Sequence, residues 1–285
     1  MKRIGFVDYY IDEWHANNYP TWIRESSYGD RFELALAWEE MTPEGKRGLE
    51  EWCREQKVGK AGSVEEVVAK CDCLVVLSPD NAERHEDLAD LPLRSGKPVY
   101  IDKPIAPSLG AARRLFAKAE EHGTPMMSCS ALRYGSALEA AIKEKVAGQR
   151  VGFAATRGEG LLHVYGIHQL EMLVMVLGTG ATRVMQCGNE PVKLMVIDYP
   201  DGRRGSISLM PGHPFQLSAQ YGEGNSLVIN AMDDFFPRFI EAMLAFFESG
   251  EPSAPKEETL EIAALLEAGM AALGSPDRWV PVPKV

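Results

Sequence analysis

The stretch CLVVLSPDNAERHEDLADLPLRSGKPVYIDKP, residues 73–104, decides the fold class of this 285-residue chain. CLVVLSP, at its start, is typical of a fully buried strand of a parallel sheet, and VYIDKP, at its end, is typical of the next one. Between them the sequence predicts a polar helix over residues 81–91 and a turn at Gly96-Lys97-Pro98. Strand, helix and strand in this order predict a βαβ unit with two parallel strands.

The same rhythm continues on both sides of this stretch. Upstream, Ser63 is expected to cap a short helix, FELALAW (32–38) reads as a strand, and IGFV (4–7) reads as the first strand. Downstream, a helix ends at Gly123 and PMMSCS (125–130) is another strand. Residues 1–128 therefore predict one Rossmann-like, doubly wound parallel α/β domain.

After Arg133 the pattern changes to short strands. An Ala-rich helix over residues 136–146 precedes six strand-like runs, and Asp201-Gly202 is the strongest hairpin signal among them. Two apolar helices close the chain. Residues 129–285 therefore predict an α+β domain with a largely antiparallel open sheet, expected to bind substrate and to form oligomers.

Composition excludes several classes of protein. Apolar residues make up 45% and charged residues 25% of the chain, as in soluble globular proteins, and the net charge of -11 disfavours nucleic acid or a membrane surface as partner. Because no apolar run has signal or membrane-spanning length, we expect a cytoplasmic protein with a small-molecule substrate. Cys71-x-Cys73 and Asp12-x-x-His15 lack further ligands nearby, so no metal site is expected.

The first strand is followed by residues that do not suit a phosphate. Dinucleotide-binding domains carry G-x-G-x-x-G there, and its glycines let backbone amides approach a pyrophosphate. This chain has Asp8-Tyr9-Tyr10 instead, which puts a carboxylate and two large rings where phosphates bind. Two alternatives follow, a nucleotide enzyme with an unusual loop or a nucleotide-enzyme fold that has given up the nucleotide.

Two residues are the candidates for chemistry. Lys103 follows a strand at the sheet edge where such folds bind ligands, and it could donate a hydrogen bond to a substrate hydroxyl. His168 begins an apolar helical stretch and could act as general acid or base, with Glu171 on the same helix face. The alternatives are a solvated surface lysine and a buried structural histidine.

Several motifs together resemble the Gfo/Idh/MocA oxidoreductases. LVVLSPDNAERH is similar to that family's strand and T-P-N-x-x-H segment, and SGKPVYIDKPIA is similar to its G-K-H-V-x-x-E-K-P-x-A signature. SALRY, YGIHQLE and the final helix also look like family segments, so the resemblance covers nearly the whole chain.

The resemblance implies a nicotinamide cofactor and a sugar or polyol substrate. Lys103 would hydrogen-bond the reacting hydroxyl and His168 would exchange its proton. The residues expected along the cofactor are Gly5, Val7, Asp8, Tyr9, Glu39, Ser78, Pro79, Asp80, His85 and Asp102, and those expected at the substrate are Arg133, Tyr134, His163 and Glu171. Glu39-Glu40 ends the second strand, which favours NAD over NADP because carboxylates repel a 2′-phosphate. The family pairs its open sheets face to face, which implies a homodimer or homotetramer.

Two departures from the family leave two functions open. The glycine loop is absent, and the family's Asp one turn before the histidine is Val164 here. The first function is an NAD(P)-dependent oxidoreductase in which a longer loop, with Trp14 to Tyr19 reshaping the pocket, holds the pyrophosphate. The second is a nucleotide-independent descendant that binds a carbohydrate-like ligand as a sensor or for other chemistry.

Overall fold

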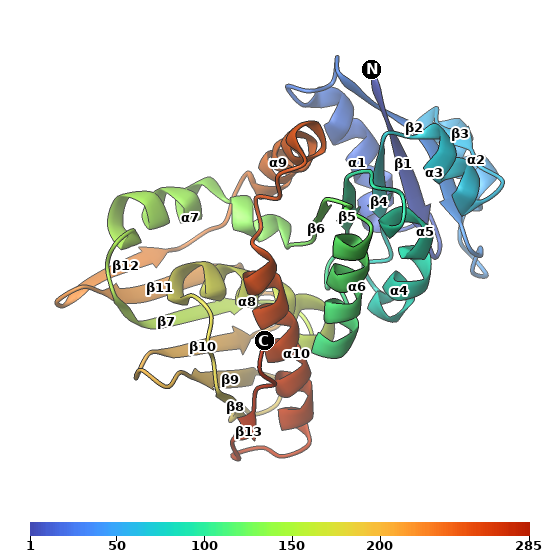
Figure 1. The fold of residues 1–285 in the computed structure, drawn as a ribbon. Helices are drawn as coiled ribbons and strands as arrows, with labels where there is room; N and C mark the ends of the chain where they lie inside the picture. Colours follow the sequence, from blue (N-terminus) through green and yellow to red (C-terminus); the bar gives the residue numbers. More distant parts are fainter. The chain divides into compact units, whose positions relative to one another are not determined.

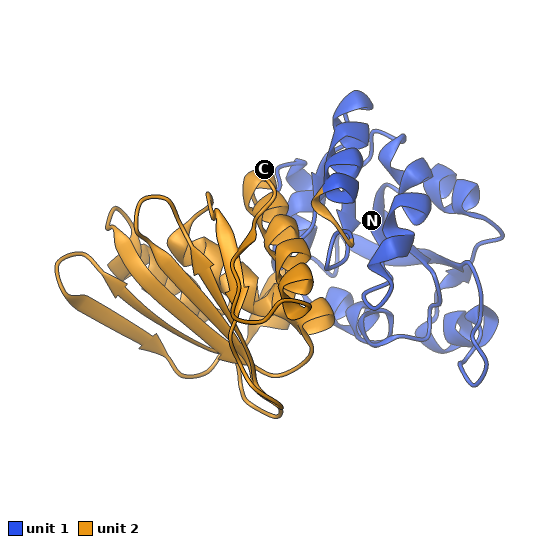
Figure 2. Cartoon of the chain, turned by 90° about the horizontal axis from the view of Figure 1, so that it is seen from below, with its two compact units in different colours: residues 1–106, 110–128, 240–254 blue, residues 107–109, 129–239, 255–285 orange.

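The computed structural model describes all residues, 1–285, and divides them into two compact units. Unit 1 consists of residues 1–106, 110–128 and 240–254, and unit 2 of residues 107–109, 129–239 and 255–285 (Figure 2). The sequence places all of 129–285 in one domain, whereas residues 240–254 pack with unit 1. None of the helices has the length and apolar character that crossing a membrane requires.

Unit 1 is built on a parallel sheet of six strands in the order β3-β2-β1-β4-β5-β6 (Figure 1). Every pairing in it is parallel, which confirms the Rossmann-like fold. The strands are β1 (Lys2–Asp8), β2 (Phe32–Glu39), β3 (Gly59–Lys60), β4 (Cys73–Val76), β5 (Val99–Ile101) and β6 (Met126–Met127). The helices are α1 (Trp14–Glu25), α2 (Leu49–Gln56), α3 (Val64–Lys70), η1 (Ala82–Arg84), α4 (His85–Leu88), α5 (Asp90–Leu93) and α6 (Leu109–Glu121).

The central strand β1 is buried on both faces, as its apolar sequence predicts. Ile4, Phe6 and Val7 have no exposed surface. Gly5 lies where α3 crosses the sheet, and a Cβ there would collide with Val67, so this glycine serves helix packing. The carboxyl ends of β1 and β5 carry Asp8 and Asp102 to the same edge of the sheet.

Two expectations for unit 1 are wrong in detail. The loop after β1 ends at Glu13 and is not unusually long, and Trp14 to Tyr19, which were expected to reshape the pocket beside it, belong to helix α1 (Trp14–Glu25). The single polar helix expected over residues 81–91 is three short pieces, η1, α4 and α5. Pro92 explains part of this break, because a proline lacks the amide that a continuing helix would use.

Unit 2 contains a seven-stranded mixed sheet in the order β12-β11-β7-β10-β9-β8-β13. Only β7 and β10 pair in parallel, so the sheet is largely antiparallel as expected. The strands are β7 (Val151–Gly158), β8 (Arg183–Gln186), β9 (Lys193–Asp198), β10 (Arg204–Leu209), β11 (Gln216–Tyr221), β12 (Asn225–Ile229) and β13 (Val280–Pro281). The helices are η2 (Ala131–Tyr134), α7 (Ser136–Ala141), the π-helix η3 (Ile142–Val146), α8 (Leu162–Leu177), α9 (Phe235–Ser249), which runs on into unit 1, and α10 (Lys256–Leu273).

Helices α8 and α10 cover one face of this sheet (Figure 1). Gly205 of β10 lies under α8, where a Cβ would press on Leu173 and Leu177. Gly178 is the C-cap of α8 and has a φ of +76°, a conformation that glycine adopts easily. On the other face, Phe153 and Val228 are 43% and 63% exposed, so the rest of the chain leaves some apolar side chains of that face open to solvent.

Candidate functional site

A buried ion pair lies at the carboxyl edge of the unit 1 sheet. His15 Nδ1 is 2.5 Å from Asp102 Oδ2, and Asp102 Oδ1 accepts the backbone amide of Lys103 at 2.8 Å. Burial alone would raise the pKa of Asp102, but the charge and hydrogen bond of His15, together with the charge of Lys103, hold it below its usual value. Asp102 is therefore an anion satisfied by its own chain.

The N-terminus of helix α1 is capped by a carboxylate. Glu13 accepts the backbone amide of His15 at 2.7 Å with one oxygen and the amide of Ala16 with the other. These are first-turn amides, which have no partner within a helix and which bind phosphate in dinucleotide folds. Since both are used by Glu13, the positive end of α1 is neutralised from within the chain.

Asp8 is the least satisfied polar group of this region. Its side chain has no exposed surface, and neither carboxylate oxygen has a hydrogen-bond partner. Burial, with the nearby charges of Glu13 and Asp102, raises the pKa of Asp8 well above its usual value. Burial and Asp102 likewise raise the pKa of Glu13 to about 7, against the opposing charge of His15. The two carboxylates therefore hold protons more tightly than exposed acids do.

The acid at the end of β2 is also used by its own chain. Glu39 accepts the amide of Ile11 at 2.9 Å through Oε2, and the amide of Leu49 at 2.8 Å and the hydroxyl of Thr42 at 2.6 Å through Oε1. The segment 40–48 is thereby fixed against the loop that follows β1. Backbone bonds from Glu40 to Asp8 and from Met41 to Tyr9 strengthen this attachment.

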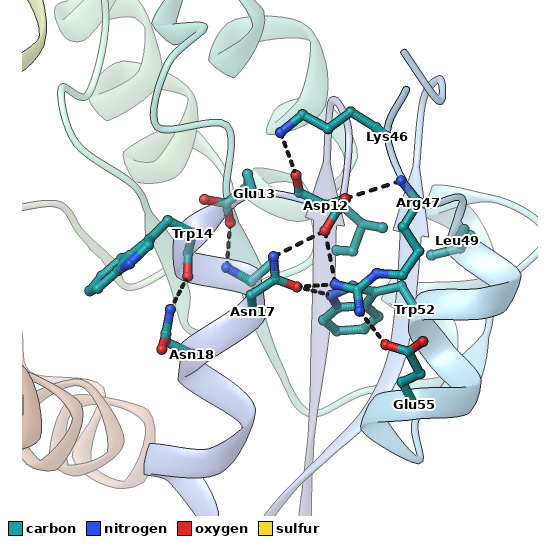
Figure 3. A network of polar contacts seen from close by, with 12 residues as sticks. Asp12, Glu13, Trp14, Asn17, Asn18, Lys46, Arg47, Leu49, Trp52 and Glu55 are labelled. Carbon is teal, nitrogen blue, oxygen red and sulfur yellow. Dashed lines mark hydrogen bonds and ion pairs between the residues drawn. The ribbon is translucent and has the colours of Figure 1, made fainter. Parts of the chain in front are cut away.

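An arginine network fastens the same segment to helix α1 (Figure 3). Arg47 donates from Nη2 to Asp12 Oδ1 at 2.8 Å and to Asn17 Oδ1 at 2.5 Å, and it also pairs with Glu55. Trp52 Nε1 donates to the same Asn17 oxygen at 2.9 Å. Asp12 is thus a partner of Arg47, and no group of three or more His, Cys, Asp or Glu side chains could hold a metal ion.

The residues of unit 1 do not fit a dinucleotide pyrophosphate. Counted from Asp8, the three glycine positions of G-x-G-x-x-G are Asp8, Tyr10 and Glu13, so each glycine function is lost to a side chain. The amides that would receive the phosphates already bind Glu13. The two acids Glu39 and Asp102, which are expected along the cofactor, have intramolecular partners.

Other residues expected along a cofactor lie in the core or at its margin. Val7 and His85 have no exposed surface, and His85 Nδ1 donates to the carbonyl of Ile105 at 2.9 Å. Ser78 and Pro79 are buried too, whereas Asp80 is exposed. Tyr9 lies under the guanidinium of Arg84 at 5.3 Å. The side chains of Val7 and His85 therefore serve the interior of unit 1.

In unit 2, His168 is half-buried and oriented by a serine. Ser130 Oγ lies 2.7 Å from His168 Nδ1, and the rings of Tyr165 and Phe215 meet the imidazole edge-on at 5.6 Å each. Ser130 is itself fixed, because Oγ accepts the amide of Leu132 at 3.2 Å. Ser130 thus provides the orienting contact that Val164 cannot.

Of the residues expected to contact substrate, Arg133, Tyr134 and Glu171 are buried and His163 is exposed. Arg133 and Glu171 are buried and bonded, Nε to Oε1 at 2.5 Å, and Arg133 also pairs with Glu258. Tyr134 is buried, with its hydroxyl 3.6 Å from Cys129 Sγ. Burial raises the pKa of Glu171 although Arg133 opposes this. His163 is exposed near the start of α8.

Four residues that the sequence reasoning missed hold these sites together. They are Glu13, His15, Arg47 and Ser130. Glu13 could have been found from glycine spacing, because it stands at the third glycine position. The contacts of His15 and Ser130 span 87 and 38 residues of sequence, and no local pattern indicates them.

Comparison with known proteins gives one family. Residues 17–129 match the model of the Gfo/Idh/MocA oxidoreductase family, described as an oxidoreductase family with an NAD-binding Rossmann fold. A mouse (Mus musculus) trans-1,2-dihydrobenzene-1,2-diol dehydrogenase is 26% identical over 187 residues, which cover 56% of this chain and 56% of the mouse protein. The match thus spans about half the length of this curated relative.

Solved structures share the fold along the whole chain. A probable dehydrogenase from Thermotoga maritima has a TM-score of 0.78 at 15% identity, covering 98% of each chain. GenD2 from gentamicin A biosynthesis, solved in complex with NAD, has a TM-score of 0.80 at 16% identity, covering 100% of this chain and 97% of that one. The family resemblance of the sequence is confirmed by the family model over residues 17–129, and the solved structures share the fold of the whole chain.

Proposed function

We propose that the protein binds a small polyhydroxylated molecule, such as a sugar, polyol or diol, and carries out acid–base chemistry at a hydroxyl-bearing carbon through His168. The observation that carries this proposal is the 2.7 Å hydrogen bond between Ser130 Oγ and His168 Nδ1. It holds an imidazole that is only half-buried in one orientation, as a general acid or base requires.

The serine hydroxyl suits both charge states of the imidazole. Because Ser130 Oγ already accepts an amide, its own hydrogen can be donated to the Nδ1 of neutral His168, which leaves the imidazole proton on Nε2. When the imidazole is protonated, Nδ1 can donate to the same oxygen. His168 can therefore take up and release a proton at Nε2 while Nδ1 keeps its partner.

Lys103 is the proposed second functional residue, acting as a cationic donor to a ligand oxygen. It follows β5 directly, is 7% exposed, and has the anionic Asp102 beside it. Arg133, Glu171 and Tyr134 were expected to contact the substrate. Because their side chains are buried, we assign them the role of supporting the residues around His168.

A dehydrogenase that uses NAD is the second candidate. The family match supports it, as do a relative named as a diol dehydrogenase and neighbours solved with NAD. In this candidate Glu39-Glu40 favours NAD over NADP. Two contacts in unit 1 argue against this candidate. The helix amides that would bind the pyrophosphate already donate to Glu13, and the Glu39 carboxylate already accepts the amide of Ile11.

The test combines ligand binding with conversion. A panel of sugars, polyols and sugar acids is screened by thermal shift, and those that bind are incubated in D2O with and without NAD and followed by ¹H NMR. His168→Asn is expected to lower conversion ~100-fold or more while ligand binding persists. His122→Asn, which changes a half-buried histidine directly after α6 in unit 1, is the control and should change little.

Each outcome has a defined meaning. No stabilising ligand in the panel, or full conversion by His168→Asn, would contradict the proposal. Conversion that requires NAD would select the second candidate, and conversion without it would select the first.

A further inference from the structure

We infer that the chain's own carboxylates, chiefly Glu13, take the place of the dinucleotide pyrophosphate, so that unit 1 binds neither NAD nor NADP. The family description names NAD binding for the segment that contains most of α1. The inference excludes the second candidate of the proposed function, and it does not depend on which small molecule binds at His168, a residue of unit 2.

The first argument is the use of the helix amides. In a dinucleotide fold the pyrophosphate accepts hydrogen bonds from amides at the N-terminus of the first helix. In this chain the Glu13 carboxylate accepts the amides of His15 and Ala16, one with each oxygen. A carboxylate has the charge and the acceptor atoms to replace a phosphate group in that position.

The second argument is steric. The second glycine of the motif allows the backbone to approach the pyrophosphate, and the third allows close packing of helix and strand. Tyr10 stands at the second position, where its ring centroid lies 5.4 Å from Lys46 Nζ. Glu13 stands at the third and is buried. Both positions carry side chains engaged with the rest of unit 1.

The third argument concerns the segment 40–48, which binds the loop after β1. The Asp12 carboxylate binds Arg47 (Figure 3). The Ile11 amide donates to Glu39, so the loop is held from both sides. A dinucleotide would have to displace Glu13 from two amides and also compete for Glu39. Each of these contacts is a charge-assisted hydrogen bond, the stronger kind in proteins.

The fourth argument is electrostatic. Asp8, Glu13 and Asp102 bring three carboxyl groups together in a buried region, with His15 and Lys103 as the nearby basic groups. Burial and mutual repulsion raise the pKa of Asp8 and Glu13. A pyrophosphate would add two more negative charges to this cluster, which like-charge repulsion opposes.

The direct test titrates the full chain with NADH and with NADPH at pH 7.5 and follows nucleotide fluorescence. The Michaelis constants of enzymes usually lie between about 1 μM and 1 mM, so a functional cofactor site would saturate in that range. We expect no saturable binding of either nucleotide up to about 1 mM. Saturable binding of either nucleotide by the wild-type chain below that concentration overturns the inference. This result would leave the sugar-binding test of the proposed function unchanged.

A paired variant tests the cause. The double variant Asp8→Gly with Glu13→Ser removes both carboxylates and keeps a good N-cap residue on α1. Its affinity for NADH is expected to be at least tenfold higher than that of the wild-type chain. Glu65→Ser, which removes an exposed carboxylate from the first turn of α3, is the control and should gain nothing.

Failure of the paired variant to gain binding, while it melts cooperatively, would overturn the assignment of these carboxylates as the cause. If the paired variant does not fold, Glu13→Ser alone is probed with inorganic pyrophosphate by calorimetry. Binding that is absent from wild type supports the inference, and no binding counts against it.

Discussion

His15 and Asp102 form a buried hydrogen-bonded pair, Nδ1 to Oδ2 at 2.5 Å, inside unit 1. His15 is the second residue of α1, and Asp102 directly follows β5, so the pair ties the first helix to the carboxyl edge of the sheet. Tyr19 stacks on the imidazole with ring centroids 5.1 Å apart. Asp102, which the family resemblance places along the cofactor, is therefore part of the protein's own interior.

We expect His15→Ala to lower the free energy of unfolding by about 3–5 kcal/mol, because it leaves the buried Asp102 carboxylate without its partner. Urea denaturation measures this change. The double variant with Asp102→Ala should lose less than the sum of the two single changes. Additive losses would show that the two side chains do not interact, and His163→Ala, at an exposed position, should stay within about 0.5 kcal/mol of wild type.

The stability of unit 1 should fall as pH rises through neutrality. The pKa of Glu13 is raised from 4.5 to about 7 in the folded chain, mainly by burial. Between these values the folded state keeps a proton that the unfolded state has lost, so the stabilisation is complete below pH 4.5 and is lost as pH rises through about 7. Asp8, whose pKa is also raised, acts in the same direction.

Melting temperatures from pH 5 to pH 8 measure this effect. Glu13→Gln should flatten the decline, and Asp8→Asn should raise the melting temperature at pH 8, because it replaces a buried carboxyl group that has no hydrogen-bond partner. A change of about 1 kcal/mol in the free energy of unfolding corresponds to a shift of about 2–4 °C in the melting temperature of a domain of about this size. A wild-type melting temperature that rises from pH 5 to pH 8 in parallel with that of Glu13→Gln would contradict the assignment.

Ser130→Ala should release the imidazole of His168 without removing it. The Oγ–Nδ1 bond of 2.7 Å is lost, so the ¹⁵N signal of Nδ1 should move and the balance of neutral tautomers should change. Conversion should fall at least tenfold while ligand affinity changes little, since positioning acts on the proton-transfer step. Ser130→Thr, which keeps the hydroxyl, should recover part of the loss. Unchanged ¹⁵N signals would exclude a positioning role.

The oligomeric state remains a prediction from the sequence. Phe153 and Val228 are exposed on the face of the unit 2 sheet opposite α8 and α10, which leaves apolar surface for a partner copy. We expect light scattering to give a dimer or tetramer, and Phe153→Glu with Val228→Glu to shift it towards the monomer. A concentration-independent mass near 31.4 kDa for wild type would refute the prediction.

Much of the fold follows from local pattern. The buried run CLVVLSP and its neighbours predict parallel strands, because they are too short for helices and are bounded by turn residues. Asp201-Gly202 marks the antiparallel turn between β9 and β10. Helix α1 could not be predicted in the same way. It is capped by Glu13, an uncommon N-cap residue, and it contains Pro20.

The candidate site could be predicted only in part. The roles of Lys103 and His168 stay predictions from their segments, and the Ser130 partner of His168 depends on a contact across 38 residues that no segment indicates. The replacement of glycines at Asp8, Tyr10 and Glu13 is visible in the sequence. That the Glu13 side chain turns back onto the amides of its own helix is a tertiary feature, which composition and spacing do not specify.

The most direct test of the central claim is a crystal structure of the wild-type chain grown with NADH in large excess. We predict that the Glu13 carboxylate lies on the amides of His15 and Ala16 and that Asp102 remains bonded to His15, with no dinucleotide density at the N-terminus of α1. A pyrophosphate bound to those amides, with the Glu13 side chain turned away, would contradict the account.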